Sequence, residues 1–274
     1  MMNRSDGIRF SDRELFFLGV LLQGQSMIGI PEPFPGWLTE EIEEQFPDIQ
    51  QALQSRGLIQ GYEDGSVELE DTLEASLRAV VLCDVAMIAT LGTPQMEVAE
   101  QRMFYFKRPQ LVELQGPEME AESRFYTLYA LDGYPATLFE ELVSWWEAIA
   151  QPAPNCVSVT LQEADLMKAR QMALEKGAAA VIDYFTTKGV NSETATALVE
   201  TLATAKKNGA LVIVARGDTG WKTENSGLLE GENGLWRLHS RESGEQRLIE
   251  CIPCDAAALR AELQLLLGRF IYGE

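Results

Sequence analysis

Two cysteines separated by two residues form the sharpest chemical motif of the sequence. Cys251 and Cys254 stand in the run Cys-Ile-Pro-Cys, between a predicted strand and a predicted helix. In redox proteins a helix N-terminus lowers the pKa of such a thiol, which makes it a better nucleophile. The spacing therefore suggests a thioredoxin-like dithiol as one hypothesis. The other hypothesis is a buried strand end, in which Pro253 helps to start the following helix and Asp255 caps it.

The position of the motif favours the strand-end hypothesis. Twenty residues of this sequence follow Cys254, fewer than the strands and helix that a thioredoxin-like fold places after its dithiol. A metal site would need two more ligands, and the chain offers His239, its one histidine, and the distant Cys83. This spacing differs from the paired ligands of structural zinc sites. We therefore expect no metal ligand and no cofactor, and a thiol enzyme that uses the pair at 251 and 254 stays as the alternative.

Other catalytic patterns are weak. His239 is also the one imidazole that could act as a general base, and no serine stands in a Gly-x-Ser-x-Gly context to pair with it. It lies in the middle of a predicted strand, so we interpret it as a solvent-facing strand residue. The sequence has neither a Walker-type loop nor a Gly-x-Gly-x-x-Gly loop. We predict no catalytic residue and regard an enzyme as the less favoured class.

The composition predicts a folded protein that stays in the compartment where it is made. The chain has 274 residues, 46% of them hydrophobic, which is enough to bury a core. Asp84 interrupts the longest apolar run, residues 79–91, so none approaches the roughly 20 apolar residues of a membrane helix. The first residues lack a signal-peptide pattern, and four scattered cysteines suit a reducing environment. We therefore predict a cytoplasmic protein.

The net charge of −20 limits the classes of partner. Such a charge repels phosphate backbones and anionic membrane surfaces, so we expect neither nucleic acid nor membrane as a ligand. Residues 1–150 hold 26 acidic and 9 basic residues, a net of −17, whereas residues 151–274 hold 16 and 13, a net of −3. Residues 11–82 have the helical segments and turn of a winged-helix module. The 14 acids and three arginines of residues 11–78 predict protein contact for it rather than DNA contact.

Helix and strand signals occur in the same order in the two halves of the chain. In the first half, Ser11 and Glu14 supply a capping box for a helix. Further helices are expected at residues 39–56, ended by Gly57, and at 69–82. Strand-like runs rich in aromatic and β-branched residues follow at 85–91, 101–107, 110–115 and 124–131. An amphipathic helix at 136–150 closes this half.

The second half repeats this order. Helices are expected at residues 161–176, 178–188 and 192–205, the last capped by Asn191 or Ser192. Strands are expected at 210–215, 227–230, 235–240 and 246–252, and a helix at 255–267. We therefore predict an α+β fold of two quasi-repeated halves, each with helices, an antiparallel strand meander and a closing amphipathic helix. The halves are residues 1–150 and 151–274, joined by the proline-containing run 151–155 and packed as one globular unit.

Three tryptophans are the candidate partner-binding residues: Trp145, Trp146 and Trp37. Large aromatic side chains are common anchors of protein interfaces. Neighbouring residues of a helix point about 100° apart, so Trp145 and Trp146 do not face one core equally. Either one of the two lies on a contact surface, or both are buried between the halves.

Several runs in the first 90 residues resemble the EspG-type chaperones of type VII secretion. They are Ser11-Asp-Arg-Glu-Leu15, Gly29-Ile-Pro31 and Trp37-Leu38, then the run from Gln51 to Ile59, and Val67 to Leu77 as a helix that leads to a strand. The two-half α+β order is also similar to the quasi-two-fold build of that family. The sequence departs from the family pattern at residues 80–84, where the helix passes into the strand.

The resemblance implies a function without catalysis. EspG-type proteins hold a helical secretion substrate in soluble form until export. The hypothesis is therefore a cytoplasmic adaptor or chaperone-like protein that binds a helical segment of a protein partner, with the acidic first half providing solubility and charge selection.

Overall fold

The computed structural model of the chain describes residues 3–4, 6–24, 27–62, 66–93, 95–96, 99–120, 123–132, 155–218, 220–232, 234–243 and 246–268. Contacts divide the chain into two compact units, each made of separate segments. Unit 1 contains Met1–Ile88, Gln101–Tyr134 and Val214–Lys222, and unit 2 contains Ala89–Glu100, Pro135–Ile213 and Thr223–Glu274. Both units combine helices with strands, which confirms the α+β class. The predicted boundary at residues 150 and 151 and the predicted helix 136–150 lie outside the described residues.

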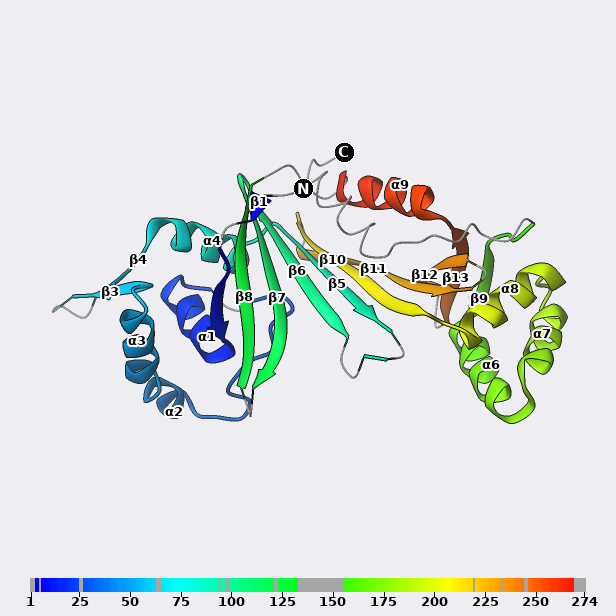
Figure 1. The fold of residues 1–274 in the computed structure, drawn as a ribbon, viewed down its shortest axis with the longest axis horizontal. Coiled ribbons are helices and arrows are strands. Elements are labelled where there is room, and N and C mark those ends of the chain that lie inside the picture. Colours follow the sequence, from blue (N-terminus) through cyan, green and yellow to red (C-terminus); the bar gives the residue numbers. More distant parts are fainter. Residues whose placement is uncertain are drawn as a thin grey trace. The chain divides into compact units, whose positions relative to one another are not determined.

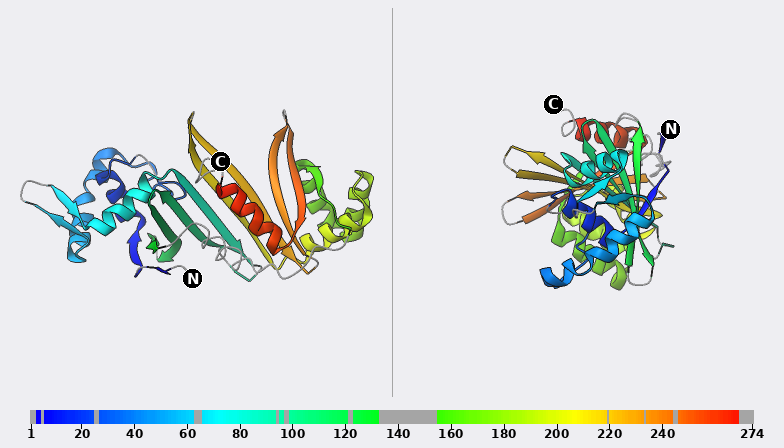
Figure 2. Two further views of the ribbon diagram at one scale, coloured as in Figure 1. Left: turned by 90° about the horizontal axis from the view of Figure 1, so that it is seen from above. Right: turned by 90° about the vertical axis from the view of Figure 1, so that its left-hand side faces the viewer.

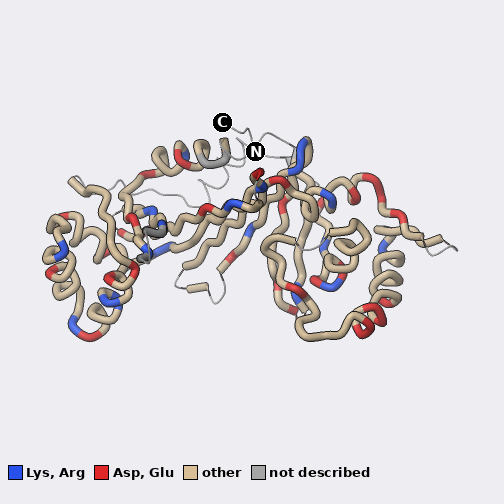
Figure 3. Tube along the Cα trace, turned by 180° about the vertical axis from the view of Figure 1, so that it is seen from behind, with Lys and Arg blue, Asp and Glu red and all other residues tan. Residues whose placement is uncertain are grey.

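The charge asymmetry of the two halves does not carry over to the compact units. Unit 1 holds 22 acidic and 11 basic residues, a net of −11, and unit 2 holds 20 and 11, a net of −9. The excess of acid in the first half is concentrated in the helical segments before the sheet, and Figure 3 shows it most clearly on α2, Thr39–Glu43.

Unit 1 combines a helical layer with a sheet (Figure 1). Its helices are α1 Asp12–Leu21, α2, α3 Phe46–Ser55 and α4 Asp71–Val81. Its strands are β1 Asn3–Arg4, β2 Ile8–Ser11, β5 Val85–Gly92, β6 Glu100–Lys107, β7 Gln110–Glu120 and β8 Ser123–Asp132, with the hairpin of β3 Ile59–Gly61 and β4 Val67–Leu69. The second half of β5, from Ala89, and the first residue of β6, Glu100, count as unit 2. The sheet order is β1-β8-β7-β6-β5, and β2 also pairs with β8.

The core of unit 1 lies between the helices and one face of this sheet. Leu15 and Leu18 of α1, Leu53 of α3 and Leu77 of α4 are fully buried against sheet residues such as Tyr105. Burying a leucine side chain stabilises the folded state by roughly 1.5–3 kcal/mol, so these contacts hold the helical layer to the sheet.

Local signals correctly placed the start of α1 and the end of α3 in unit 1. The capping box is confirmed, because the Ser11 hydroxyl accepts from the Glu14 amide and the Glu14 carboxylate accepts from the Ser11 amide. Gly57 follows α3 with a positive φ of 70°, as predicted for a helix end. The predicted helix 39–56 is wrong in one respect. It is broken between α2 and α3, where Pro47 in the first turn of α3 has no amide proton to continue a helix.

The predicted start of the third helix is also wrong. Residues 67–69 form β4, and the helix begins at Asp71. Glu70 caps it, because its carboxylate accepts from the Leu73 amide at 2.8 Å. Strand β4 thus contains Leu69, the first residue of the predicted helix, and also Val67 and Glu68, which the family resemblance placed in a helix.

Unit 2 has a strand, a three-helix bundle, further strands and a last helix (Figures 1 and 2). The elements are β9 Val159–Gln162, α6 Glu163–Lys176, α7 Ala178–Thr187, α8 Ser192–Ala203, β10 Lys207–Gly217, β11 Gly220–Gly231, β12 Gly234–Ser243, β13 Gln246–Cys254 and α9 Ala256–Leu267. The end of β10 and the start of β11, within Val214–Lys222, count as unit 1. The sheet order is β10-β11-β12-β13-β9. In this unit a strand, β9, and three helices precede the four strands β10 to β13. In the first half β2 and the helices likewise precede the four strands β5 to β8. The internal duplication itself stays a prediction.

The bundle packs on one face of β9, β12 and β13. Phe185 of α7 and Leu198 of α8 are fully buried with Trp236 of β12 and Cys251 of β13. Leu161, predicted as the start of a helix, lies instead in β9, where it pairs with Ile249.

A search of the described residues for a helix long and apolar enough to span a membrane finds none.

Candidate functional site

The two cysteines of the motif point to opposite faces of one strand. Both lie in β13, where side chains alternate, so residues three apart face opposite sides. Cys251 packs with the α6–α8 bundle. Cys254 instead lies close enough to Arg237, and to Glu262 of α9, for their charges to influence its pKa. Three steps of strand separate two Cα atoms by about 10 Å, beyond the roughly 7 Å that a disulfide tolerates. The geometry therefore does not allow this pair to work as a dithiol.

The strand-end hypothesis is confirmed in most of its details. Cys251 and Cys254 are buried, and the Asp255 carboxylate caps α9 by accepting from the Ala258 amide at 2.8 Å. Pro253 is the exception, since it lies inside β13 opposite Trp236 and not in the first turn of the helix. Burial raises the pKa of both thiols to about 12. The motif thus has the opposite of the low pKa that redox thiols require.

We expect Cys251 and Cys254 to resist alkylation in the folded protein. At two pH units below a pKa of about 12, the thiolate fraction is about 1%, and burial also blocks access. Iodoacetamide labelling followed by mass spectrometry between about pH 7 and pH 10 should leave both thiols unmodified, and labelling in urea should modify them. Rapid labelling of either thiol in the native protein would contradict the burial and the raised pKa of both thiols.

The remaining catalytic candidates have ordinary structural surroundings. His239 lies in β12 opposite Glu250, and its Nδ1 is 3.2 Å from the carbonyl oxygen of Asn225. It is partly exposed, as the sequence indicated. Within the described part of the chain, no group of three or more His, Cys, Asp or Glu residues has the geometry to hold a metal ion.

One of the three predicted partner-binding tryptophans is described, and it lies at the surface. Trp37 is 43% exposed, and the next residue, Leu38, is more exposed still. Trp145 and Trp146 lie outside the described residues. The role of all three in partner binding stays a prediction.

Trp37 is the outer end of an aromatic row on unit 1. The Phe34 ring packs edge-on against Phe16 of α1, with centroids 5.5 Å apart, and on its other side lies 5.3 Å from the Trp37 ring. The Arg13 guanidinium lies over both Phe34 and Trp37, at 5.5 and 5.9 Å from their centroids. Phe34 is buried and Trp37 is exposed, so the row leads from the helical core to the surface.

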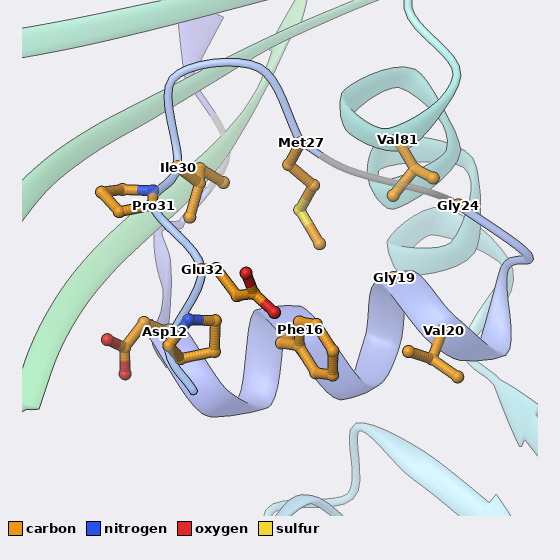
Figure 4. Close-up of a pocket in the computed structure, with 11 residues that line it drawn as sticks. Asp12, Phe16, Gly19, Val20, Gly24, Met27, Ile30, Pro31, Glu32 and Val81 are labelled. Atoms are coloured by element: carbon orange, nitrogen blue, oxygen red, sulfur yellow. The ribbon is translucent and has the colours of Figure 1, made fainter. Parts of the chain in front are cut away.

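An apolar pocket opens at the inner end of this row (Figure 4). It has a volume of about 260 Å³ and lies between α1, the segment 27–33 and the end of α4. Its apolar lining comes from Phe16, Val20, Met27, Ile30 and Val81, with prolines and glycines, and its two acidic residues are Asp12 and Glu32. Pro31 and Pro33 belong to this lining, and sequence reasoning missed the role of their segment as a pocket wall.

The second surface feature is the outer face of α6 in unit 2. Met167 and Leu174 are 61% and 84% exposed. Seven residues make two helical turns, so these side chains lie on one face of the helix. Leu166, Ala169 and Met172 on the other side pack into the bundle core. A single exposed leucine is ordinary, but a helix with apolar residues aligned on both sides has a second face suited to contact.

Charge at this face is balanced, in contrast to the rest of the chain. Helix α6 has three acidic residues and three basic ones, Lys168, Arg170 and Lys176. Arg170 is exposed and stands between Met167 and Leu174 on the same side of the helix. Among the residues that the structure describes, no carboxylate forms an ion pair with it. The face therefore offers two apolar side chains and an available cation.

A polar cluster fixes α6 against α7. The Tyr184 hydroxyl donates to Asp165 Oδ1 at 2.5 Å, and Lys188 Nζ lies 3.0 Å from the same oxygen. Lys168 Nζ lies 4.7 Å from the centroid of the Tyr184 ring. The hydrogen bond from Tyr184 is the main cause that lowers the pKa of Asp165, and Lys188 adds to it.

Replacing Asp165 by asparagine is expected to destabilise the bundle by about 1–2 kcal/mol at neutral pH, because charge-assisted hydrogen bonds are lost. The folded pKa of Asp165 is lowered, so its stabilisation is present above the unfolded pKa near 3.9 and is lost as the pH falls through the folded value. Urea denaturation should therefore show a difference between wild type and Asp165→Asn at about pH 7 that shrinks near pH 3. A difference that is constant with pH would contradict this.

Comparison with solved structures finds a full-length likeness. The chain is similar to the Mycobacterium tuberculosis type VII secretion system chaperone EspG5, seen in complex with a PE25-PPE41 dimer. The TM-score is 0.66 over 98% of both chains, with 15% sequence identity. A second structure, of HtdX from the same organism, gives a TM-score of 0.13 at 10% identity and carries no argument. The EspG-like resemblance of the sequence is thus confirmed in the fold.

No protein-family model matches the sequence. No curated protein matches it either. At 15% sequence identity, the likeness to EspG5 is a likeness of the fold.

Proposed function

We propose that this chain is a cytoplasmic, chaperone-like adaptor that binds a helical segment of a protein partner, as a type VII secretion chaperone binds its substrate. The observation that carries the proposal is the fold shared with EspG5 over 98% of both chains. That protein is a chaperone observed in complex with a protein dimer. The net charge of −20, which disfavours nucleic acid and membrane surfaces, supports a protein partner.

The outer face of α6 is the surface that we assign to this partner. When a second helix packs along α6 at a shallow angle, the α6 residues that contact it recur about every seven residues, which is two turns. Met167 and Leu174 have this spacing. Each anchor would contribute roughly 1.5–3 kcal/mol if it became fully buried. Arg170 would pair with an acidic residue beside the apolar stripe of the partner. The partner is therefore an amphipathic helix with acidic flanks.

Affinity purification from the native host tests the function directly. The tagged full chain should recover a partner in stoichiometric amount, and mass spectrometry should identify in it an amphipathic helix of the stated pattern. Genes for secretion components or small helical proteins beside this gene would add support. Repeated recovery of the chain without a stoichiometric partner, under several growth conditions, would count against the proposal.

The thiol-enzyme alternative is separable from this function. Cys251 and Cys254 are buried on opposite faces of β13, so their chemistry should be irrelevant to partner binding. A variant with both cysteines replaced by serine, at a temperature where it is folded, should recover the same partner as wild type. Loss of recovery in a folded double variant would reopen the alternative.

A further inference from the structure

The pocket of unit 1 has the size of a site for one side chain. Its volume is about 260 Å³. A dry cavity of about 150 Å³ already holds benzene, whereas pockets for cofactors and drug-sized ligands run from about 300 to 1,000 Å³. Leucine, methionine or phenylalanine therefore fits, and a nucleotide-sized ligand is too large.

The walls of the pocket are apolar, and one of them is adaptable. Phe16 and Val20 extend from α1, Met27 and Ile30 from the following segment, and Val81 from the last turn of α4 (Figure 4). Val20 is among the exposed large hydrophobic residues, so apolar surface continues from the pocket to the solvent. The Met27 thioether is flexible and polarisable, which lets the pocket adjust to the shape of an inserted side chain.

One carboxylate is available at the rim. The two acidic side chains of the lining differ, because Asp12 Oδ2 is 2.9 Å from Arg124 Nε and is turned away from the pocket, whereas the Glu32 carboxylate points toward Phe16 (Figure 4). Glu32 is exposed, and within the described residues no cation forms an ion pair with it. Arg124 contacts the Glu32 backbone oxygen, and Arg13 lies over Phe34 and Trp37.

The surroundings extend this negative charge. Residues 11–78, which form the helical layer around the pocket, contain 14 acidic residues and three arginines. Glu40, Glu41 and Glu43 of the short helix α2 are exposed. Their potential attracts a cationic segment before contact and repels an acidic one.

We propose that the pocket between α1, the segment 27–33 and α4 binds one large apolar side chain of a lysine- or arginine-rich segment of a protein partner, and that Glu32 pairs with a cation next to that side chain. This site goes beyond the function proposed above. It lies in unit 1 and selects a basic segment, whereas the α6 face lies in unit 2 and selects a helix with acidic flanks.

Synthetic peptides and the full-length protein test the proposal. The probe is a short capped peptide with a central leucine flanked by lysines, and its two counterparts carry alanine in place of leucine or glutamate in place of lysine. Calorimetry should detect the first peptide, with binding weakened about tenfold or more by either change. Labelled methionine methyl groups, with Met27 assigned through Met27→Leu, should show that the peptide shifts Met27.

A matched pair of variants separates the site from the general charge. Glu32→Lys should weaken binding of the lysine peptide about tenfold or more. Glu44→Lys makes the same charge change at an exposed residue outside the pocket lining. It should change the affinity only about twofold, because salt screens distant charges. Equal effects of the two variants, equal binding of the alanine peptide, or an unshifted Met27 methyl would overturn the proposal.

Other occupants give different results. If Glu32→Lys changes the oligomeric state in sedimentation, the pocket holds a second copy of the chain and the proposal is wrong. The Glu32→Lys variant should recover the partner that binds the α6 face as well as wild type does. Loss of peptide binding at the pocket can therefore be distinguished from loss of the adaptor function.

Discussion

Replacing both Met167 and Leu174 by aspartate will reduce recovery of the partner to background. The two side chains are 61% and 84% exposed on one face of α6, so the change leaves the bundle core intact and removes both apolar anchors. At roughly 1.5–3 kcal/mol for each buried anchor, the loss amounts to about 100-fold or more in affinity. Aspartate next to a helix with acidic flanks adds repulsion. Affinity purification, followed by calorimetry with the identified partner, measures the effect.

A matched control comes from the other unit. Met119 of β7 is 60% exposed, almost the same as Met167, so Met119→Asp makes the same chemical change elsewhere. It should recover the partner like wild type. The double α6 variant should also keep its melting temperature, because outward-facing side chains contribute little to folding. Full recovery by the double variant would exclude α6 as the docking face and leave the adaptor function to be tested with other surfaces.

The sequence predicted those elements whose ends are set by nearby residues. Ser11 with Glu14, and Asn191 with the Thr194 amide, cap helices through contacts three residues apart. Such contacts depend on the local chain alone, and a short window of sequence contains all of the information. Gly57 and Gly177 end helices through positive φ angles that glycine adopts without strain, another local property.

Elements that depend on distant partners were missed or misread. β9 exists because Val159 and Leu161 pair with β13, nearly at the other end of the second half, and no local pattern reveals that ladder. The same holds for β2, whose Phe10 pairs with Tyr126 of β8. The break between α2 and α3 is different, since Pro47 was visible in the sequence and its missing amide proton predicts the break.

The candidate surfaces show the same division between local and distant information. The Cys-x-x-Cys motif suggested chemistry while Cys254 was placed at a helix N-terminus, but a strand that continues through Cys254 puts the two thiols on opposite faces. Helix α6 was predicted, and the seven-residue spacing of Met167 and Leu174 is visible in the sequence. Which side of α6 is buried depends on where α7 and β13 lie. The structure was therefore needed to show that the Met167 and Leu174 side chains are exposed.

A buried ion pair in unit 1 should be highly sensitive to substitution. Arg102 Nε donates to Glu113 Oε1 at 2.5 Å, and Gln115 Nε2 donates to the same oxygen at 2.9 Å. Glu113 of β7 has no exposed surface. Arg102 lies on the neighbouring strand β6, and its Cζ is 5.2 Å from the centroid of the Phe104 ring. Arg102→Met removes a charged donor from a buried carboxylate and should destabilise the protein by about 3–5 kcal/mol in urea denaturation.

The double variant Arg102→Met with Glu113→Leu tests whether charge or packing causes that loss. Replacing both members of a buried pair by apolar residues of similar size is often neutral, so the double variant should regain most of the stability lost by Arg102→Met alone. Fluorescence and circular dichroism should follow one transition in each variant, so that the free energies can be compared. If the double variant is as unstable as the single one, the contribution of Arg102 comes from its packing on Phe104 and not from the charge of Glu113.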